Sequence, residues 1–487
     1  MASYQPVIGL EVHAELETRS KMFCRCPVVD STSAEPNSSV CEICCGMPGT
    51  LPVINRRAVE FALRVALALD CDVAETSRFA RKNYFYPDLP KGFQISQYEM
   101  PLATGGRLEI ETETGPRLIG IRRVHLEEDT GKLFHLSDHS LIDFNRAGVP
   151  LLEIVSEPAL HSVDEVHAYA TGLRDLLRYL GVNSGDMEKG VIRFEANLSL
   201  RLPGDDQLGT RVEIKNLNSF RAMTRALAFE VERQAGILAS GQPVRQETLG
   251  WDEAAGVTIS QRGKEQAEDY RYFPEPDLPP LVVARSWVEQ IRVELPELPA
   301  AKRARFVEQY ELTPYLAVVL TSDRLVADYF EAASLAAKIA PPVKVANWLT
   351  GDLFGLLNDR GLTLSAEAFP PENLAGLVDL LEGGTINQPV AKDVLAASFD
   401  SGTRPADIVA QQSLEQESDP AHLGPVIDTV LRQNPDQVAQ YTGGKTALSH
   451  WFFGRVMQAT GGKADPQVVR ALLEEALQAL STDVDRA

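Results

Sequence analysis

Residues 7–16 read VIGLEVHAEL, and their apolar and polar side chains alternate. Successive side chains of a β-strand point to opposite faces. An extended chain here would therefore place Glu11, His13 and Glu15 together on one face, and its other face would carry Ile8, Leu10, Val12, Ala14 and Leu16. We predict a half-buried strand with two acids and a histidine in a row on its polar side.

Four further stretches share this pattern: residues 122–129 (RRVHLEED), 149–156 (VPLLEIVS), 191–202 (VIRFEANLSLRL) and 210–217 (TRVEIKNL). Their polar faces would carry His125, Glu127, Glu153, Arg193, Glu195, Asn197, Arg211, Glu213 and Lys215. A capped amphipathic helix is predicted at 163–180. Such strands would form one antiparallel sheet, packed on helices on one side and forming a charged cradle on the other. The alternative is an ordinary solvated sheet face with no chemistry.

The remaining chain is helical in pattern, so the predicted fold class is α+β. We expect a domain of strands and helices at 1–292 that carries the polar faces, a helical domain at 293–405 and a small helical tail domain at 406–480. The polar, acidic stretch 411–422 (QQSLEQESDPAH) is typical of a linker.

The composition is that of a globular protein, with 487 residues, 44% hydrophobic content and a net charge of −21. No apolar run of about 18 residues and no signal-peptide pattern is present, so we expect a cytoplasmic chain without a membrane span. The negative charge argues against nucleic acid as a partner, because phosphate-binding proteins normally carry a basic surface. Binding depends on local patches, however, and the charge does not exclude it.

Five of the six cysteines lie between positions 24 and 45. Cys24 and Cys26 form one close pair, and Cys41 and Cys44 form another. Two thiolate pairs joined by a loop supply the four soft ligands of a structural Zn²⁺ site. An iron–sulfur cluster and unliganded thiols are the alternatives. We attach no function to Cys45, and Cys71 is expected in the core.

Residues 78–98 (SRFARKNYFYPDLPKGFQISQ) interleave basic and aromatic side chains. This composition suits a nucleotide or a tRNA end, which pairs with cations and stacks on rings. A packed aromatic loop with exposed lysines is an equal alternative. The chain has no GxxxxGK[ST] phosphate loop, because TGGKTAL at 442–448 lacks its first glycine spacing, and no GxSxG nucleophile turn.

Several long motifs resemble the B-subunit family of the tRNA-dependent aspartyl/glutamyl amidotransferases. They are GLEVHAELETRSKMFC, RKNYFYPDLPKGFQISQY, HLEEDTGK, DFNRAGVPLLEIVSEP, EIKNLNSF, DYRYFPEPDL, ANWLTGDL and GKADP. The resemblance implies a cradle related to glutamine synthetase within a heterotrimeric ligase. Its A subunit would release ammonia from glutamine and its C subunit would brace the pair. The B subunit would use ATP to phosphorylate, and then amidate, the side-chain carboxylate of Glu-tRNA(Gln) or Asp-tRNA(Asn).

Combined with this resemblance, the polar faces supply candidates for each role. Candidate catalytic residues are Glu11, His13, Glu127, Glu128 and Glu153, of which Glu11, His13, Glu127 and Glu153 are the main Mg²⁺ candidates. Candidates for ATP and substrate contacts are Arg193, Glu195, Asn197, Lys215 and Asn218. Lys82, Tyr86 and Lys91 are placed near the tRNA end or the ammonia entrance. Relatives usually carry Asp in place of Glu195, whose extra methylene moves the carboxylate by about 1.5 Å and puts direct ligation in doubt.

The tail offers a local basic patch, since residues 440–470 contain Lys445, Arg455, Lys463 and Arg470 against one acid, Asp465. We expect the tail to bind the tRNA body. Two other functions stay open. One is a non-catalytic adaptor that presents tRNA to the A subunit, and the other is a ligase acting on a free amino acid. The sequence does not distinguish Glu-tRNA(Gln) from Asp-tRNA(Asn) as the substrate.

Overall fold

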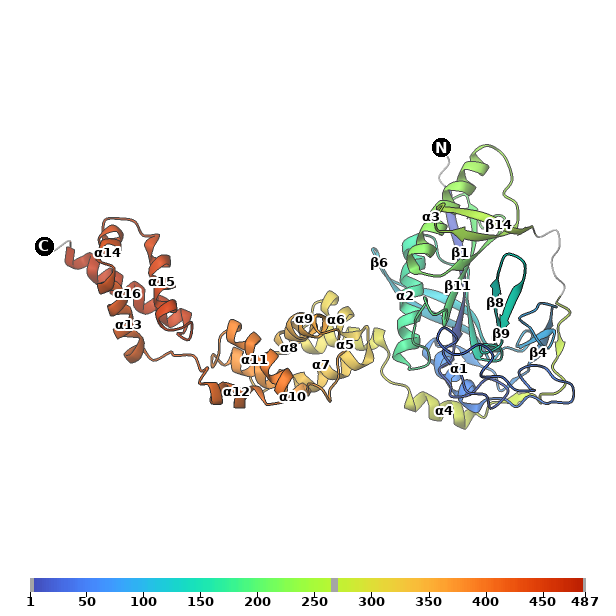
Figure 1. Ribbon diagram of the computed structural model, residues 1–487. Helices are drawn as coiled ribbons and strands as arrows, with labels where there is room; N and C mark the ends of the chain where they lie inside the picture. The colour runs from blue at the N-terminus through green and yellow to red at the C-terminus, as the bar shows by residue number, and fades with distance from the viewer. Residues whose placement is uncertain (1–3, 264–269, 485–487) are drawn as a thin grey trace. The chain divides into compact units, whose positions relative to one another are not determined.

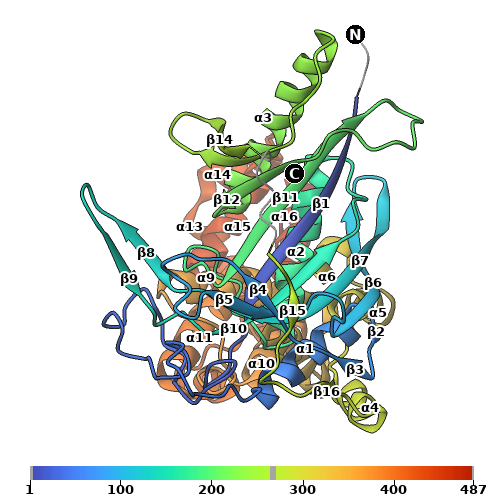
Figure 2. The ribbon, with the colours of Figure 1, turned by 90° about the vertical axis from the view of Figure 1, so that its right-hand side faces the viewer.

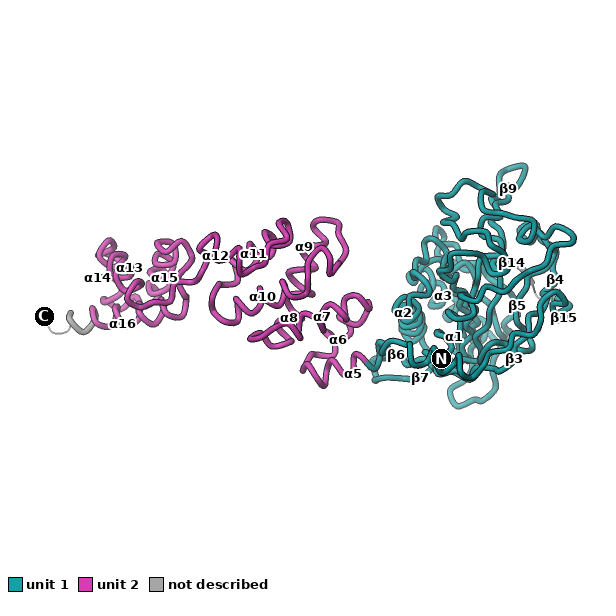
Figure 3. Tube along the Cα trace, turned by 90° about the horizontal axis from the view of Figure 1, so that it is seen from below, with its two compact units in different colours: residues 1–301 teal, residues 302–487 magenta. Residues whose placement is uncertain are grey.

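The computed structural model describes residues 4–263 and 270–484 (Figure 1). The chain forms two compact units, residues 1–301 and 302–487, coloured separately in Figure 3. The buried apolar cores lie within single units. None of the described helices is both long and apolar enough to cross a bilayer.

A nine-stranded sheet organises the first unit, in the order β14-β13-β12-β11-β1-β10-β7-β6-β2. Its strands are β1 (Gln5–Glu15), β2 (Asp72–Val73), β6 (Ala103–Thr112), β7 (Gly115–Glu128), β10 (Pro150–Ser156), β11 (Ile192–Arg201), β12 (Val212–Leu217), β13 (Glu247–Asp252) and β14 (Val257–Gly263). All five stretches predicted as strands are therefore strands of one sheet, and residues 7–16 lie at its centre.

The five predicted strands pair antiparallel with one another, as expected, but the sheet as a whole is mixed because one further pair is parallel. β12 and β13 run parallel, with Glu213 opposite Thr248, whereas the other paired strands of this sheet are antiparallel. The helix α3 (Phe220–Ala239) connects them and returns the chain to the edge of the sheet at which β12 begins. Such a crossover is what a parallel pair requires. The relation of the sheet to glutamine synthetase stays a prediction.

Helices cover the apolar face of the sheet (Figure 2). They are α1 (Arg56–Ala68), α2 (Val163–Tyr179) and α3. The predicted helix at 163–180 is confirmed: the Ser162 side chain accepts a hydrogen bond from the Glu165 backbone N–H, and Gly181 follows the helix with φ +64°. Fully burying a leucine such as Leu173 contributes about 1.5–3 kcal/mol, so this face holds the unit together.

Short strands complete the first unit beside the helix α4 (Arg285–Glu294). β4 (Ala80–Asn83), β5 (Phe93–Ser96) and β15 (Phe273–Pro274) form a three-stranded sheet, and β3 (Thr76–Ser77) pairs with β16 (Leu281–Val282). β8 (Lys132–His135) and β9 (Ser140–Asp143) form a hairpin that stands out from the unit in Figure 2. Two strands of the three-stranded sheet, β4 and β5, come from the basic-aromatic stretch 78–98.

The second unit is helical and contains two separate cores. Its elements are α5 (Pro299–Tyr310), α6 (Pro314–Thr321), α7 (Arg324–Ala336), α8 (Pro342–Trp348), a π-helical turn (Leu349–Leu353), α9 (Phe354–Asp359), α10 (Pro371–Glu382), α11 (Gln388–Ser401), α12 (Pro405–Gln412), α13 (Pro420–Gln433), α14 (Pro435–Thr442), α15 (Leu448–Ala459) and α16 (Pro466–Val484). One core gathers residues 306–409 and the other residues 423–477. Residues 413–419, inside the expected linker, lie between α12 and α13.

Candidate active site and metal sites

The polar face of the sheet brings acids and histidines of three neighbouring strands into register. On β1, His13 lies opposite Glu153 of β10 and Arg193 of β11. Glu153 in turn lies opposite His125 of β7. Cross-strand neighbours have Cβ atoms about 5 Å apart, so the alternation of each strand places these side chains in contact.

His13, Glu127 and Glu153 form the first group of potential metal ligands, with one ligand atom of each lying within 4.8 Å of the others. The His13 Nε2 lies 3.5 Å from the Glu153 Oε2 and 3.7 Å from the Glu127 Oε1. His125, which is 2% exposed, places its Nε2 3.1 Å from the same Glu153 oxygen. Two imidazoles therefore converge on one buried carboxylate.

The charges of this group are strongly coupled. Burial raises the pKa of Glu127, and the nearby charge of Glu153 raises it further. Burial alone would raise the pKa of Glu153 too, but the charges and hydrogen bonds of His125 and His13 hold it well below its usual value. Burial would lower the pKa of His13, whereas its hydrogen bond to Glu153 and the surrounding carboxylates raise it to about 9.

Glu11, Glu195 and Glu213 form the second group, from β1, β11 and β12. Burial raises the pKa of Glu11, and the carboxylates of Glu153 and Glu195 add to the effect. The Lys215 Nζ lies 2.7 Å from Glu195 and 3.5 Å from Glu213. The Asn197 side-chain amide donates to the Glu11 Oε1 at 2.9 Å.

Both groups fit a divalent cation. Each offers carboxylate oxygens, the ligands that hard cations such as Mg²⁺ prefer, and the first adds one imidazole. Burial is the largest cause of the raised pKa values of Glu11 and Glu127, and neighbouring carboxylates raise them further. A divalent cation between them would relieve this repulsion.

Arg193 lies beside the first group and is held by a buried acid. Its Nη1 donates to the Asp129 Oδ2 at 2.8 Å, and the Arg146 Nε lies 3.7 Å from the same oxygen. Burial alone would raise the pKa of Asp129, but these two guanidinium groups lower it. Burial and the Asp129 charge raise the pKa of nearby Glu15 to about 8.

A cavity of about 420 Å³ opens over both groups. Its floor includes Glu11, His13, Glu127, Glu153, Arg193, Glu195, Glu213 and Lys215, and its wall includes Lys82, Tyr84, Tyr98, Tyr270 and Tyr272. A second cavity, of about 200 Å³, shares Glu11 and follows β1 toward Val7 and Gly9, with Asn197 and Arg211 in its lining. Glu11 thus separates two hollows on one sheet face.

Four predicted residues lie apart from the two groups. Glu128 follows Glu127 on β7 and points the other way, where it forms a buried ion pair with Lys91 and accepts from the Ile95 N–H at 2.9 Å. This pair borders a cavity of about 160 Å³ beside the cysteine loop. Asn218 and Tyr86 are exposed and are not among the residues that line the large cavity.

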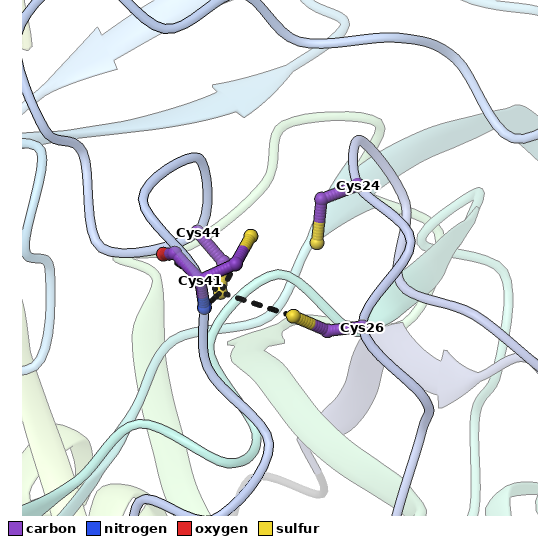
Figure 4. Close-up of side chains that lie close together, drawn as sticks. All are labelled: Cys24, Cys26, Cys41 and Cys44. Atoms are coloured by element: carbon purple, nitrogen blue, oxygen red, sulfur yellow. Dashed lines mark hydrogen bonds between the residues drawn. The ribbon is translucent and has the colours of Figure 1, made fainter.

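Cys24, Cys26, Cys41 and Cys44 point their sulfur atoms toward one another from two loops (Figure 4). The Cys44 Sγ lies 4.0 Å from that of Cys26 and 3.9 Å from that of Cys41, and one sulfur of each cysteine lies within 4.8 Å of the rest. Tetrahedral zinc with bonds of about 2.3 Å holds sulfurs about 3.8 Å apart. The four thiols therefore fit a closed Zn²⁺ site, and Cys45 is not part of the group.

Several residues in or beside the cavity were not among the predicted site residues. Glu213 and His125 carried the same signal as the predicted ones, because both lie on polar faces of alternating strands. Asp129 and Arg146 lie at the end of a strand and in a loop, where the alternation gives no direction. Tyr270 and Tyr272 lie far along the chain from the other tyrosines, and a pairing of β15 with β4 brings them near.

Comparison with known families agrees with this geometry. Residues 6–289 match the family described as the GatB/GatE catalytic domain, and residues 328–477 match the GatB domain. The chain belongs to the amidotransferase B-subunit family. Members of this family extend the likeness over the whole chain.

Three relatives illustrate this likeness, and each is named as the B subunit of an aspartyl/glutamyl-tRNA(Asn/Gln) amidotransferase. The protein of Moorella thermoacetica is 52% identical over 478 residues, covering 97% of this chain and 100% of the relative. That of Roseiflexus castenholzii is 50% identical, covering 97% and 99%. That of Carboxydothermus hydrogenoformans is 47% identical, covering 99% and 100%.

Proposed function

We propose that this B-subunit family member activates the side-chain carboxylate of Glu-tRNA(Gln), Asp-tRNA(Asn) or both with ATP, and then amidates it. The observation that carries this proposal is the pair of ligand groups, His13/Glu127/Glu153 and Glu11/Glu195/Glu213, on the floor of one cavity. A carboxylate is a poor electrophile. One of its oxygens must therefore become part of a leaving group before ammonia can attack the carbon. Phosphoryl transfer supplies that group.

Over the two steps, an O–P and a C–N bond form, and a P–O bond, a C–O bond and one N–H bond break. A carboxylate oxygen of the aminoacyl side chain bonds to the γ-phosphorus while the bond to the bridging oxygen breaks and ADP leaves. Ammonia then attacks the acyl carbon, and the C–O bond to phosphate breaks with release of phosphate and a proton. Bound Mg²⁺ would neutralise the charge between the phosphates.

The residues of the chain divide these tasks by position. Glu11, His13, Glu127 and Glu153, together with Glu195 and Glu213, would hold divalent cations on the cavity floor. Lys215, placed by Glu195 and Glu213, faces the cavity with its positive charge and pairs with phosphate oxygens. Arg193 is fixed by Asp129 and supplies a second cation. The second cavity beyond Glu11 leaves room for the nucleoside of ATP.

The remaining predicted residues lie outside the two ligand groups, and we assign some of them to the routes by which the tRNA end and ammonia reach the cavity. Lys82 lines the cavity wall, where it meets the tRNA end. Lys91 and Glu128 border the separate hollow beside the cysteine loop, which suits the ammonia entrance. Asn218, which is exposed and outside the cavity lining, stays a candidate substrate contact. Zn²⁺ in the four thiols would hold the loop that carries Cys24 to Cys44.

We place the chain in a three-subunit ligase with a glutaminase A subunit and a small C subunit. The relatives are named as B subunits, which supports an assembly. Ammonia released from glutamine by the A subunit would reach the cavity, and the tail with Lys445, Arg455, Lys463 and Arg470 would bind the tRNA body.

The test uses the assembled enzyme with mischarged tRNA, γ-labelled ATP and glutamine. We expect tRNA-dependent release of labelled phosphate, and a drop of at least 100-fold in Glu153→Gln and Glu11→Gln. The exposed Glu109→Gln on β6 serves as the control, and glutamine hydrolysis checks assembly. Unchanged phosphate release in both cavity variants would favour the adaptor function, and release with free glutamate would favour the free-amino-acid ligase.

A further inference from the structure

Four tyrosines from two distant segments gather on one wall of the large cavity. Tyr84 and Tyr98 flank β4 and β5, and Tyr270 and Tyr272 precede β15. The rings of Tyr98 and Tyr272 lie 4.2 Å apart at an angle of 8°. Tyr270 contacts both Tyr84 and Tyr272 edge-on, and the Lys82 Nζ lies 4.9 Å from the centre of the Tyr270 ring.

The parallel pair differs from the aromatic contacts of the cores. In the described part of the chain, every other pair of aromatic rings is tilted by 32° or more, as for Phe306 and Phe330 at 60°. Tyr98 is also 48% exposed, although it lines the cavity. A stacked pair whose outer ring meets solvent is a surface on which a nucleobase adds a further layer.

The tyrosine wall lies close to the first ligand group. Burial raises the pKa of Tyr272, and the charges of Glu127 and Glu153 raise it further. Lys82 acts on Glu127 in the opposite sense, since its charge lowers the pKa of that acid. The tyrosine rings, the ammonium group of Lys82 and the carboxylates of the first ligand group therefore lie in the same part of the cavity.

We propose that Tyr98, backed by Tyr272, is the stacking platform for the terminal adenine of the aminoacyl-tRNA, and that Lys82 pairs with the phosphate that precedes it. This inference rests on the proposed function and names the place of the tRNA end within that site. The aminoacyl ester is attached to the ribose of the terminal adenosine. A base fixed on Tyr98 therefore leaves the side-chain carboxylate free to reach His13, Glu127 and Glu153.

The adenine of ATP could stack on Tyr98 in the same way. The position of the second cavity argues against this assignment. The second cavity begins at Glu11 and extends along β1 to Gly9 and Val7. Gly9 and His13 are four residues apart on an extended strand, which is roughly 13 Å. The second cavity reaches the ligand groups only at Glu11, whereas the tyrosine wall belongs to the large cavity, so the nucleoside of ATP and the tRNA end have separate places. The exposed ring of Tyr98 then meets the substrate whose body stays outside.

The experiment compares Tyr98→Leu, Tyr98→Phe and Tyr98→Trp in the assembled enzyme. We expect Tyr98→Leu to raise the KM for mischarged tRNA about tenfold or more, the size of a lost base–ring stack, and to leave the KM for ATP within twofold. Phe and Trp keep a flat ring and should hold the KM for tRNA within a few-fold. Glutamine hydrolysis and the thermal unfolding curve report on assembly and folding.

A direct probe is tRNA whose terminal adenosine is replaced by 2-aminopurine riboside, because stacking quenches its fluorescence. Binding to the parent enzyme and to Tyr98→Phe should quench it, and Tyr98→Leu should not. Equal quenching by all variants, or a raised KM for ATP with an unchanged KM for tRNA, overturns the proposal. Failure of the proposed function shows separately, as absence of tRNA-dependent phosphate release in the parent enzyme.

Discussion

Lys21 and Cys44 form a buried contact, with the Lys21 Nζ 3.7 Å from the Cys44 Sγ. Lys21 is 0% exposed, and its other hydrogen bonds go to the carbonyl oxygens of Ser39 and Phe144 at 2.7 and 3.2 Å. Within the described residues no carboxylate lies within ion-pair distance of this ammonium group. A buried charge needs a partner of opposite sign. Zinc bound by four thiolates carries a net charge of −2, and Lys21 is placed to balance part of it.

We therefore predict that Lys21→Met weakens zinc retention. Loss of an outer partner of a metal site commonly lowers metal affinity by about 10- to 100-fold. The measurement is the rate of zinc transfer to a coloured chelator, with Lys344→Met, a half-exposed lysine of the second unit, as the control. Equal release rates in the parent and Lys21→Met proteins would show that the charge of Lys21 is not needed.

Gly46 connects the cysteine loop to the Lys91–Glu128 pair. Its φ is +68°, and a Cβ atom there would lie 2.5 Å from the Lys91 Cγ. Gly49 also has a positive φ, +83°, but nothing lies within 4 Å of its Cβ position. Both alanine variants meet the same backbone cost, about 1–2 kcal/mol, and Gly46→Ala adds a steric clash of about 1–3 kcal/mol. We expect denaturant unfolding to show Gly46→Ala as the less stable of the two; equal stabilities would contradict the contact with Lys91.

Glu213 tests the second ligand group with a residue outside the predicted set. Its carboxylate lies with those of Glu11 and Glu195, so Glu213→Gln removes one charge from the group. We expect the Mg²⁺ concentration for half-maximal tRNA-dependent ATP hydrolysis to rise at least tenfold. The exposed Glu111→Gln on β6 should leave it unchanged. A Glu213→Gln enzyme with an unaltered Mg²⁺ requirement would remove Glu213 from the site.

The alternation of side chains predicted much of the sheet, but it did not predict contacts between segments that are distant in the sequence. Residues 7–16 form a strand whose apolar side is buried, because period-two burial is a local property. The same rule separates Glu127 from Glu128, which the motif HLEED presents as equivalent. The parallel direction of β13 could not be read this way, since alternation is the same in both directions. The burial of Lys21 and the meeting of Tyr98 with Tyr272 depend on long-range packing.

The basic residues of the tail predict a salt-dependent contact with tRNA. Lys445 and Arg455 lie beside and on α15, and Arg455 is placed over the Trp451 ring at 5.1 Å. Each lysine or arginine that pairs with a phosphate releases about one counterion. We expect the Lys445→Ala, Arg455→Ala double variant to bind tRNA more weakly and to show a salt dependence shallower by about one to two counterions. Lys344→Ala is the control, and an unchanged slope would place the tRNA body elsewhere.

The ion pairs of Glu331 make the stability of the second unit dependent on pH. It lies 3.0 Å from the buried Lys302 and 2.8 Å from Arg305. Burial alone would raise the pKa of Glu331, but the hydrogen bonds from Arg305 and Lys302 lower it. A lowered folded-state pKa contributes stability above the unfolded value, about 4.5, and this contribution is lost as the pH falls through the folded value.

We expect Glu331→Gln to lower the free energy of unfolding at pH 7 by about 1–2 kcal/mol, because the side chain is 27% exposed and Lys302 keeps Asp328 at 2.9 Å. The gap between parent and variant should narrow as the pH falls below 4.5, since protonation removes from the parent the charge that the variant already lacks. Calorimetry of the whole chain at several pH values measures it, with the exposed Glu308→Gln on α5 as the matched control. A gap of constant size across this range would mean that Glu331 acts through packing and not through its charge.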